Sequence, residues 1–287
     1  MPIRPRRSAL YMPASNQKAI DKARALDCDA VILDLEDAVA PDAKETARTQ
    51  AVAAVKAGGF GRREVIIRVN GLDTPWGEDD LKAAAEAGPD AILVPKINDG
   101  ADVARYDGRL SHAPAKTRLW TMIETCRCLF HLEGIAAAAR TSRLDCWVMG
   151  TNDLAKEMGA KLTGAREPFL GALGLSVAAA KAYGLSILDG VYNGIDDAEG
   201  FERQCEQGLQ FGFDGKTLIH PSQVEPCNRV FTPSDTEVAF ARAVIAAFAL
   251  PENASKGAIR VEGKMAERLH LVQAEKLVAI AEAIAAA

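Results

Sequence analysis

Three acidic residues stand close together at the end of an apolar stretch. In the segment VILDLEDAV, residues 31–39, a run of side chains typical of a buried strand leads into Asp34, Glu36 and Asp37. Carboxylates this close repel one another and lose hydration where a strand end is packed. They therefore need cations or strong hydrogen-bond donors nearby, and the cluster predicts a site that also contains positive charge.

Charged and polar residues also follow other apolar stretches in the same way. They are Arg68 and Asn70 in IIRVNG, Lys96 in ILVPKIND, Glu124 in TMIET, Asp153 in VMGTNDLA, and Lys216 and His220 in GKTLIHPSQ. Taken singly, each has a structural explanation: Arg68 as a solvated strand end, Asp153 as a helix N-cap, or His220 as the start of a helix. A shared position after successive strands is what favours a common site.

The elements that would position these residues follow a repeated pattern. Strands are predicted at residues 8–13, 30–35, 65–69, 91–95, 119–123, 146–149, 186–188 and 213–218, and helices at 17–25, 43–57, 79–87, 101–110, 129–139, 169–183 and 196–210. Alternating strands and helices are typical of βα units around a parallel sheet. Eight strands in 287 residues favour a closed (β/α)8 barrel of the TIM type. An open doubly wound sheet is the alternative, because periodicity does not establish closure.

We predict two parts in the chain, a catalytic barrel at residues 1–231 and a C-terminal helical extension or lid at residues 232–287. The stretch PENASKGAIRVEGKM contains turn-forming residues and a short strand. The final helix, predicted at residues 266–287, would then form a mobile cover.

Composition excludes several classes of protein. Hydrophobic residues make up 48% and charged residues 25%, as in a globular protein, and no apolar run is long enough to cross a bilayer. The net charge of -5 argues against nucleic acid or an anionic membrane as a partner. The first residues lack the pattern of a signal peptide, and the six cysteines form no CxxC pair, so we expect a reduced, cytoplasmic protein.

In a TIM barrel, reactive groups lie at the carboxyl ends of the strands. Glu124 and Asp153 come from consecutive strands and would supply two hard oxygen ligands, which suits Mg²⁺ with substrate and water completing its shell. Arg68 would offer a planar fork to a carboxylate or to a developing oxyanion. A metal ion and an arginine beside a dry pocket can stabilise an enolate.

With these residues in place, the sequence resembles the citrate lyase β-subunit and malyl-CoA lyase family, within the HpcH/HpaI aldolase superfamily. The resemblance covers nearly the whole chain. It rests on RSALYMPASNQKAIDKA, AVILDLEDAVAPDAKETAR, IIRVNG, ILVPKI, MIET, VMGTNDLA, GFDGKTLIHPSQV and VEGKMAERLHLVQAEKLV, in the family's order.

The resemblance implies a set of roles for residues of the site. Glu124 and Asp153 would bind Mg²⁺, with Mn²⁺ as the alternative ion, and Arg68 would contact the keto acid or thioester oxygen. The remaining assignments are Asp37 and Glu267 as catalytic residues, Glu36 and backbone N–H groups near Gly150 as substrate contacts, and Arg7 and Lys22 as contacts to the CoA phosphates. Together with Asp34, the residues Glu36 and Asp37 would also form an outer ring around the metal waters and Arg68.

The activity implied is a lyase that cleaves or forms a 3-hydroxyacyl-CoA such as malyl-, citramalyl- or citryl-CoA, yielding acetyl-CoA and a 2-oxo acid. Homotrimers or hexamers are implied as well. One departure stands out: many family lyases carry an aspartate in a GKMxD tail motif, and this chain has Glu267 there, in GKMAE. The alternatives are a citrate lyase β subunit acting on an acyl carrier protein thioester, a malyl-CoA thioesterase, and a non-catalytic keto-acid-binding homologue.

Overall fold

The structure, a computed structural model, describes residues 4–286. It contains two compact units, one formed by Arg6–Arg229 and the other mainly by the chain from Val230 onwards. Among the described helices, none is both long and apolar enough to cross a bilayer.

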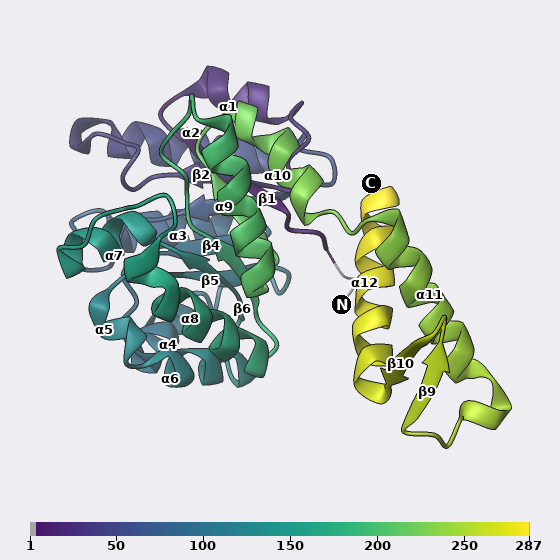
Figure 1. The fold of residues 1–287 in the computed structure, drawn as a ribbon. Helices are drawn as coiled ribbons and strands as arrows, with labels where there is room; N and C mark the ends of the chain where they lie inside the picture. The colour runs from purple at the N-terminus through teal and green to yellow at the C-terminus, as the bar shows by residue number, and fades with distance from the viewer. Residues whose placement is uncertain (1–3, 287) are drawn as a thin grey trace. The chain divides into compact units, whose positions relative to one another are not determined.

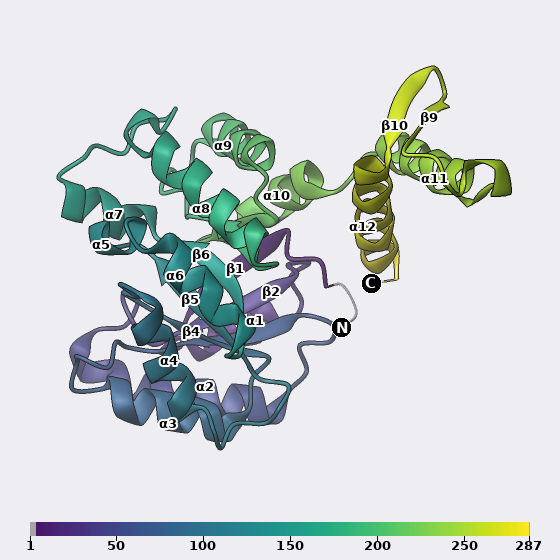
Figure 2. The ribbon, with the colours of Figure 1, turned by 90° about the horizontal axis from the view of Figure 1, so that it is seen from below.

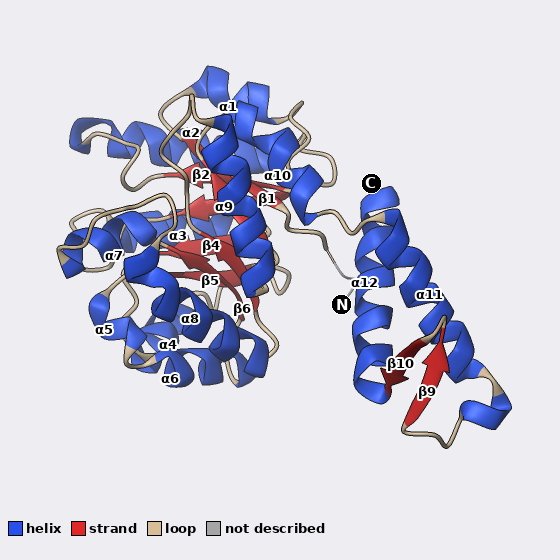
Figure 3. Ribbon diagram, viewed as in Figure 1, coloured by secondary structure: helices blue, strands red, loops and turns tan. Residues whose placement is uncertain are grey.

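The first unit is a closed barrel of eight parallel strands surrounded by helices (Figures 1 and 3). The strands are β1 (Ser8–Pro13), β2 (Ala30–Asp34), β3 (Glu64–Arg68), β4 (Ala91–Val94), β5 (Arg118–Ile123), β6 (Leu144–Met149), β7 (Ser186–Asp189) and β8 (Gly215–Leu218). Each strand pairs with the next in sequence, and β8 returns to pair with β1, where Ser8 lies opposite Lys216. The predicted TIM-type barrel is confirmed, and the open sheet is excluded.

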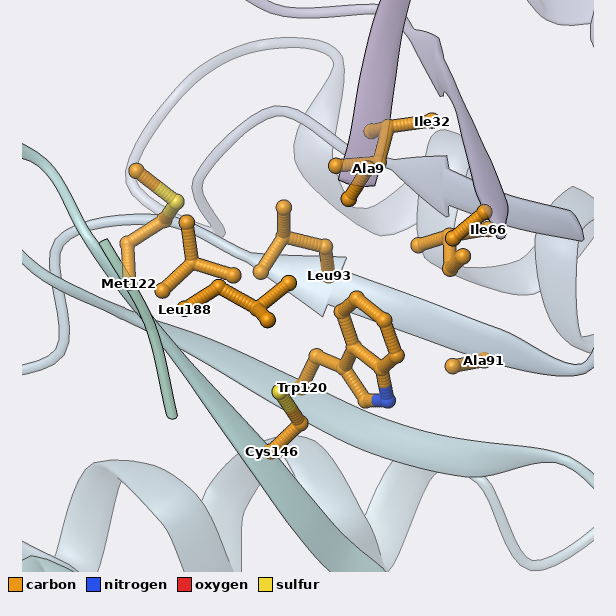
Figure 4. Packing of buried hydrophobic residues seen from close by; sticks show 11 residues of the cluster. Ala9, Ile32, Ile66, Ala91, Leu93, Trp120, Met122, Cys146 and Leu188 are labelled. Atoms are coloured by element: carbon orange, nitrogen blue, oxygen red, sulfur yellow. The ribbon is translucent and has the colours of Figure 1, made fainter. Parts of the chain in front are cut away.

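Both faces of the strands are buried, which explains their continuous apolar sequences. All five residues of β2, Ala30–Asp34, are buried, for example. Inside the barrel, every second residue of neighbouring strands joins one cluster, in which Trp120 lies among smaller side chains such as Ala9 and Ala91 (Figure 4). This packing fixes the strand ends and hence the positions of the residues that follow them.

The helices of the barrel lie on its outside, as the second view also shows (Figure 2). They are α1 (Gln17–Ala23), α2 (Lys44–Ala57), α3 (Gly77–Ala87), α4 (Gly100–Arg109), α5 (Cys126–Leu129), α6 (Leu132–Ala137), α7 (Thr151–Met158), α8 (Leu170–Ala182), α9 (Ala198–Phe211) and α10 (Val224–Phe231). Short 3₁₀ helices are η1 (Pro41–Ala43), η2 (Ala138–Arg140), η3 (Glu167–Phe169) and η4 (Pro221–Gln223). The single helix expected at residues 129–139 is instead α5, α6 and η2, and α7 was not predicted.

Ion pairs close the barrel at the amino-terminal ends of its strands. Arg6 binds Glu64 at 2.7 Å and Asp145 at 2.5 Å, and its guanidinium lies over the ring of Trp120, 4.8 Å from the centroid. Arg7 forms a two-pronged ion pair with Asp29, at 2.9 and 2.7 Å. We assign these contacts to the stability of the barrel, because they lie at the amino-terminal ends of the strands, whereas the polar residues of the predicted site follow the carboxyl ends.

The second unit has a small core of its own. It comprises α11 (Asp235–Ala249), η5 (Pro251–Asn253), the antiparallel pair β9 (Ala258–Val261) and β10 (Lys264–Glu267), and α12 (Arg268–Ala285). Val244, Phe248, Val261 and Ala274 pack together in it. The final helix begins at Arg268 rather than at Ala266, because Ala266 pairs in β10.

Candidate active site

A cavity of about 280 Å³ opens at the carboxyl ends of the strands. Arg68, Glu124 and Asp153 line it, together with Asp37 from the loop after β2 and Gly150 from the end of β6. The structure therefore brings together side chains that the sequence separates by more than a hundred positions, because the strand ends of a parallel barrel meet at one rim.

Arg68 is the centre of the acidic cluster after β2. Its Nε and Nη2 donate to the two oxygens of Asp34, each at 2.6 Å, and its Nη1 lies 2.7 Å from Oε2 of Glu36. The contact with Glu36 is an ion pair without hydrogen-bond geometry, since Oε2 has no hydrogen-bond partner among the described residues. Asp37 lies farther away, with Oδ2 at 3.4 Å from Nη1. The guanidinium supplies the positive charge that the acidic cluster requires.

The three carboxylates of the cluster differ in how free they are. Asp34 is fully engaged, because its oxygens also accept the N–H groups of Glu36 at 2.9 Å and Ala38 at 3.2 Å. Glu36 is buried and held by two cations, Arg68 and Lys96. The side chain of Asp37 is 61% exposed, and its one ion pair within residues 4–286 is the long contact with Arg68. Asp37 is therefore the carboxylate of this cluster that is available to a ligand.

Lys96 connects this cluster to the two predicted metal ligands. Its Nζ donates to Oε1 of Glu36 at 3.0 Å and lies 3.9 Å from Oε1 of Glu124 and 3.8 Å from Oδ1 of Asp153. Burial alone would lower the pKa of Lys96, but the charges of Glu124 and Glu36 raise it well above its usual value. Lys96 is thus a permanent cation among three carboxylates.

Glu124 is almost fully buried, with 1% of its side chain exposed. Burial, and secondarily the charge of Glu36, raise its pKa to about 8. Its Oε1 accepts the backbone N–H of Lys96 at 2.8 Å, whereas its Oε2 has no hydrogen-bond partner among the described residues. Gly150 provides the room for this side chain: a Cβ there would lie 2.4 Å from Oε2 of Glu124. The glycine is needed for this close approach, not for an unusual backbone angle.

This arrangement fits a hard divalent cation. Glu124 offers a buried carboxylate oxygen without a hydrogen-bond partner among the described residues, and Asp153 offers a second carboxylate. Mg²⁺ in proteins is commonly bound by one or two carboxylates and takes its remaining ligands from water or substrate. In the described part of the chain, no group of three or more His, Cys, Asp or Glu side chains is arranged as a complete metal site. Further ligands would have to be substrate or water oxygens.

Two residues of the barrel that were expected at the site, Arg7 and Lys22, do not line the cavity. Arg7 lies at the other end of β1, where Asp29 engages its guanidinium, and its assignment to a CoA phosphate has no support in this geometry. Lys22 is exposed in the last turn of α1. Glu267 belongs to the second unit, where it is the N-cap residue of α12 and its N–H donates to Nδ1 of His270 at 2.8 Å.

The remaining strand-end predictions have separate outcomes. The N–H of Gly150 donates to the carbonyl of Ile123 at 3.0 Å and is therefore not available to a substrate. The backbone N–H groups that a substrate could use are those in the first turn of α7. Lys216 is fully buried and donates to Asp189 at 2.7 Å, without lining the cavity. His220 caps η4, as its structural explanation held.

Sequence reasoning missed two residues that shape the site. Tyr11 lines the cavity, and its ring lies under the guanidinium of Arg68, 4.8 Å from centroid to Cζ. Its place near the end of the first predicted strand was the available signal. Lys44 is buried in α2 and donates to the carbonyls of Leu35 and Glu36, each at 2.8 Å. No sequence signal pointed to Lys44, because it lies within a helix.

The chain matches the family model described as HpcH/HpaI aldolase/citrate lyase over residues 7–221. It is 48% identical over 282 residues to a (3S)-malyl-CoA thioesterase of Cereibacter sphaeroides, covering 98% of this chain and 96% of that protein. It is 35% identical to an L-malyl-CoA/beta-methylmalyl-CoA lyase of the same species, covering 99% and 97%.

Among solved structures, the fold is similar to CitE of Mycobacterium tuberculosis in complex with magnesium, acetoacetate and coenzyme A. The TM-score is 0.76 and the identity 28%, with 96% of this chain and 97% of that one covered. The match of the family model, the identity to curated relatives and the similarity of the fold agree with one another. The chain belongs to the HpcH/HpaI aldolase/citrate lyase family.

Proposed function

We propose that this protein hydrolyses the thioester bond of malyl-CoA or a closely similar 3-hydroxyacyl-CoA. The observation that carries the proposal is the 48% identity to a (3S)-malyl-CoA thioesterase over 98% of the chain, against 35% to a malyl-CoA lyase. The expectation of a lyase as the main activity therefore becomes the second candidate. Glu267, in place of the aspartate of the lyase tail motif, is in line with this order.

We further propose Glu124 and Asp153 as ligands of Mg²⁺, with Mn²⁺ as an alternative. The buried, unpaired Oε2 of Glu124 supports this assignment. When bound, such an ion supplies Lewis-acid polarisation of a substrate oxygen. Gly150 has the role of leaving space for Glu124, and the backbone N–H of Lys96 holds its other oxygen.

Arg68 has two roles in this proposal. Its Nε and one N–H of Nη2 are committed to Asp34, which fixes the plane of the guanidinium between Asp34 and the ring of Tyr11. The same side chain lines the cavity, so its outer edge can donate to a carboxylate or thioester oxygen of the substrate. A guanidinium fixed in this way needs little reorganisation when charge develops on that oxygen.

Asp37 is the proposed general base. It is the exposed member of its cluster, and its contact with Arg68 is long. In hydrolysis, Asp37 takes a proton from a water molecule whose oxygen attacks the thioester carbon. The C–S bond then breaks, the sulfur leaves as the CoA thiolate, and a proton restores the thiol. Water supplies the atoms that the free acid gains.

Carbon–carbon cleavage is the second candidate, favoured by the identity to the lyase and by the family itself. Here Asp37 removes the proton of the 3-hydroxyl group. The bond between the hydroxyl-bearing carbon and its neighbour breaks, giving a 2-oxo acid and an acetyl-thioester enolate, which Glu267 would protonate. Replacing Glu267 by Asp should then raise the share of cleavage products relative to free thiol, and an unchanged product ratio would contradict this role.

We also propose that the protein forms a homotrimer or a hexamer and that it is located in the cytoplasm. The oligomer follows from the family resemblance, and a role of Glu267 would be played across a subunit interface. Light scattering of the purified protein measures the first expectation directly.

One incubation distinguishes the candidate activities. Malyl-CoA is supplied with Mg²⁺ or with EDTA, and free thiol is measured with a thiol reagent while the 2-oxo acid is measured as its hydrazone. Hydrolysis releases thiol without 2-oxo acid; cleavage releases 2-oxo acid without thiol. We expect thiol release that EDTA abolishes.

Matched variants connect the activity to the site. Asp37→Asn should lose about a hundredfold in turnover, as expected for a general base. Asp42→Asn removes a similar charge from an exposed position of η1 and should behave as the wild type. Formation of neither product, with pyruvate or oxaloacetate still bound, would instead indicate the non-catalytic homologue.

A further inference from the structure

Lys96 has a backbone conformation that is more common for glycine. It follows β4 with φ of 54°, in the left-handed region that costs energy for a residue with a Cβ. This conformation has two results. The N–H of Lys96 reaches Oε1 of Glu124 at 2.8 Å, and its Nζ reaches Oε1 of Glu36 at 3.0 Å.

The ammonium group of Lys96 lies close to three acidic side chains. It is within 4.0 Å of both proposed metal ligands, at 3.9 Å from Glu124 and 3.8 Å from Asp153. Only the contact with Glu36 is a direct hydrogen bond. A lysine that paired with Glu36 alone would not need to approach the other two carboxylates, which share no other cation in the ion pairs of the described residues.

We infer that Lys96 is a positioning residue that fills the cation position between Glu36, Glu124 and Asp153 in the metal-free protein and withdraws from Glu124 and Asp153 when a divalent ion binds. This inference rests on the metal assignment in the proposed function. An ammonium and a divalent ion cannot both remain within about 4 Å of the same oxygens without strong repulsion.

The side chain has the means to withdraw. It is 44% exposed, so solvent can receive its charged end, and its stem is flexible. The backbone N–H of Lys96 need not move with it, and Glu124 therefore keeps its hydrogen bond and its orientation. Lys96 would thus hold the three acidic side chains together before the ion arrives and compete with the ion for their oxygens.

Lys96→Met tests the inference because it keeps the length of the stem and removes the charge. Two changes in opposite directions are expected. The affinity for Mn²⁺, measured by calorimetry without substrate, should rise at least about tenfold. The melting temperature in EDTA should fall by at least about 2 °C, because the carboxylates lose their shared cation.

Two further variants separate the charge at this position from the overall charge. Lys96→Arg keeps a cation and should bind Mn²⁺ about as the wild type does. Lys156→Met removes an exposed lysine from α7, the helix that carries Asp153, and should change neither quantity. An unchanged or weaker affinity in Lys96→Met, or a gain shared by Lys156→Met, would overturn the inference.

A measurement on the wild type does not depend on the folding of any variant. Acetylation of Lys96 by a water-soluble reagent, followed by peptide mass spectrometry, should become faster when Mn²⁺ is added, since the ammonium group is released. Constant reactivity with bound Mn²⁺ would refute the inference and leave the proposed function intact. Absence of Mn²⁺ binding in wild type and Lys96→Met alike would remove the metal from the proposed function and refute this inference with it.

Discussion

Replacing Glu124 by Gln changes the charge of the site with little change in size. Burial, together with the charge of Glu36, raises the pKa of Glu124 from 4.5 to about 8. A carboxyl group with a raised pKa in the folded protein weakens folding as pH increases, because the unfolded chain releases its proton first. The effect is absent below the unfolded pKa, grows as pH rises and is complete above the folded pKa.

The size of the effect follows from the two pKa values. The interval from 4.5 to about 8 corresponds to at most about 5 kcal/mol, at about 1.4 kcal/mol per pH unit. Glu36 and Lys96 share the charge balance with Glu124, which spreads the titration over several groups. We therefore expect Glu124→Gln to gain at least about 2 kcal/mol in unfolding free energy relative to wild type between about pH 5 and about pH 8.

Urea denaturation in EDTA at a series of pH values measures this difference. Subtracting the wild type from the variant at each pH cancels the other titrating groups and leaves the contribution of Glu124. Glu86→Gln, at an exposed position of α3, is the matched control and should give a difference that does not vary with pH. Glu124→Gln should also bind Mn²⁺ more weakly than the wild type does. A pH-independent difference for Glu124→Gln would refute the electrostatic reasoning.

Three further substitutions test contacts of the barrel. Arg68→Lys should lower kcat/KM by about a hundredfold in the thiol-release assay, since a point charge cannot replace the fork; near wild-type kinetics would exclude the role of Arg68. Gly150→Ala should weaken Mn²⁺ binding in calorimetry, because the new Cβ would lie 2.4 Å from an oxygen of Glu124; unchanged affinity would contradict the assignment. Arg7→Met should lower the unfolding free energy by about 3–5 kcal/mol, because the buried Asp29 loses its cation and keeps only the backbone N–H of residue 7 from this contact, with KM for the CoA ester unchanged; a raised KM would support the phosphate contact.

The number and order of the strands could be predicted from the sequence. Parallel strands buried on both faces appear as short apolar runs, and their polar ends mark one rim of the barrel. That is why Arg68, Glu124 and Asp153 could be assigned to one cavity before any contact was known. The helix α7 (Thr151–Met158) was missed because a segment of eight residues with few apolar positions is too short for the helical period to be recognised.

The partners of each charged residue could not be predicted in the same way. Arg7 and Arg68 look alike in the sequence, each beside an apolar strand, yet one is used by Asp29 at the closed end and the other lines the cavity. The difference depends on which end of the strand each residue occupies and on which carboxylate lies within reach. Distances between residues far apart in the chain are set by packing, not by spacing.

Local sequence thus determined the strands and most of the helices, the closed architecture as the favoured fold and the chemistry available at the rim, because periodicity and residue type act over a few positions. Only the tertiary structure decided how that chemistry is distributed. It engaged Asp34 with Arg68 and with two backbone N–H groups, left Asp37 exposed, and gave Lys96 a left-handed backbone conformation close to three acidic side chains. Hydrogen bonds and burial depend on separations of a few ångströms, and these exist only once the barrel has closed.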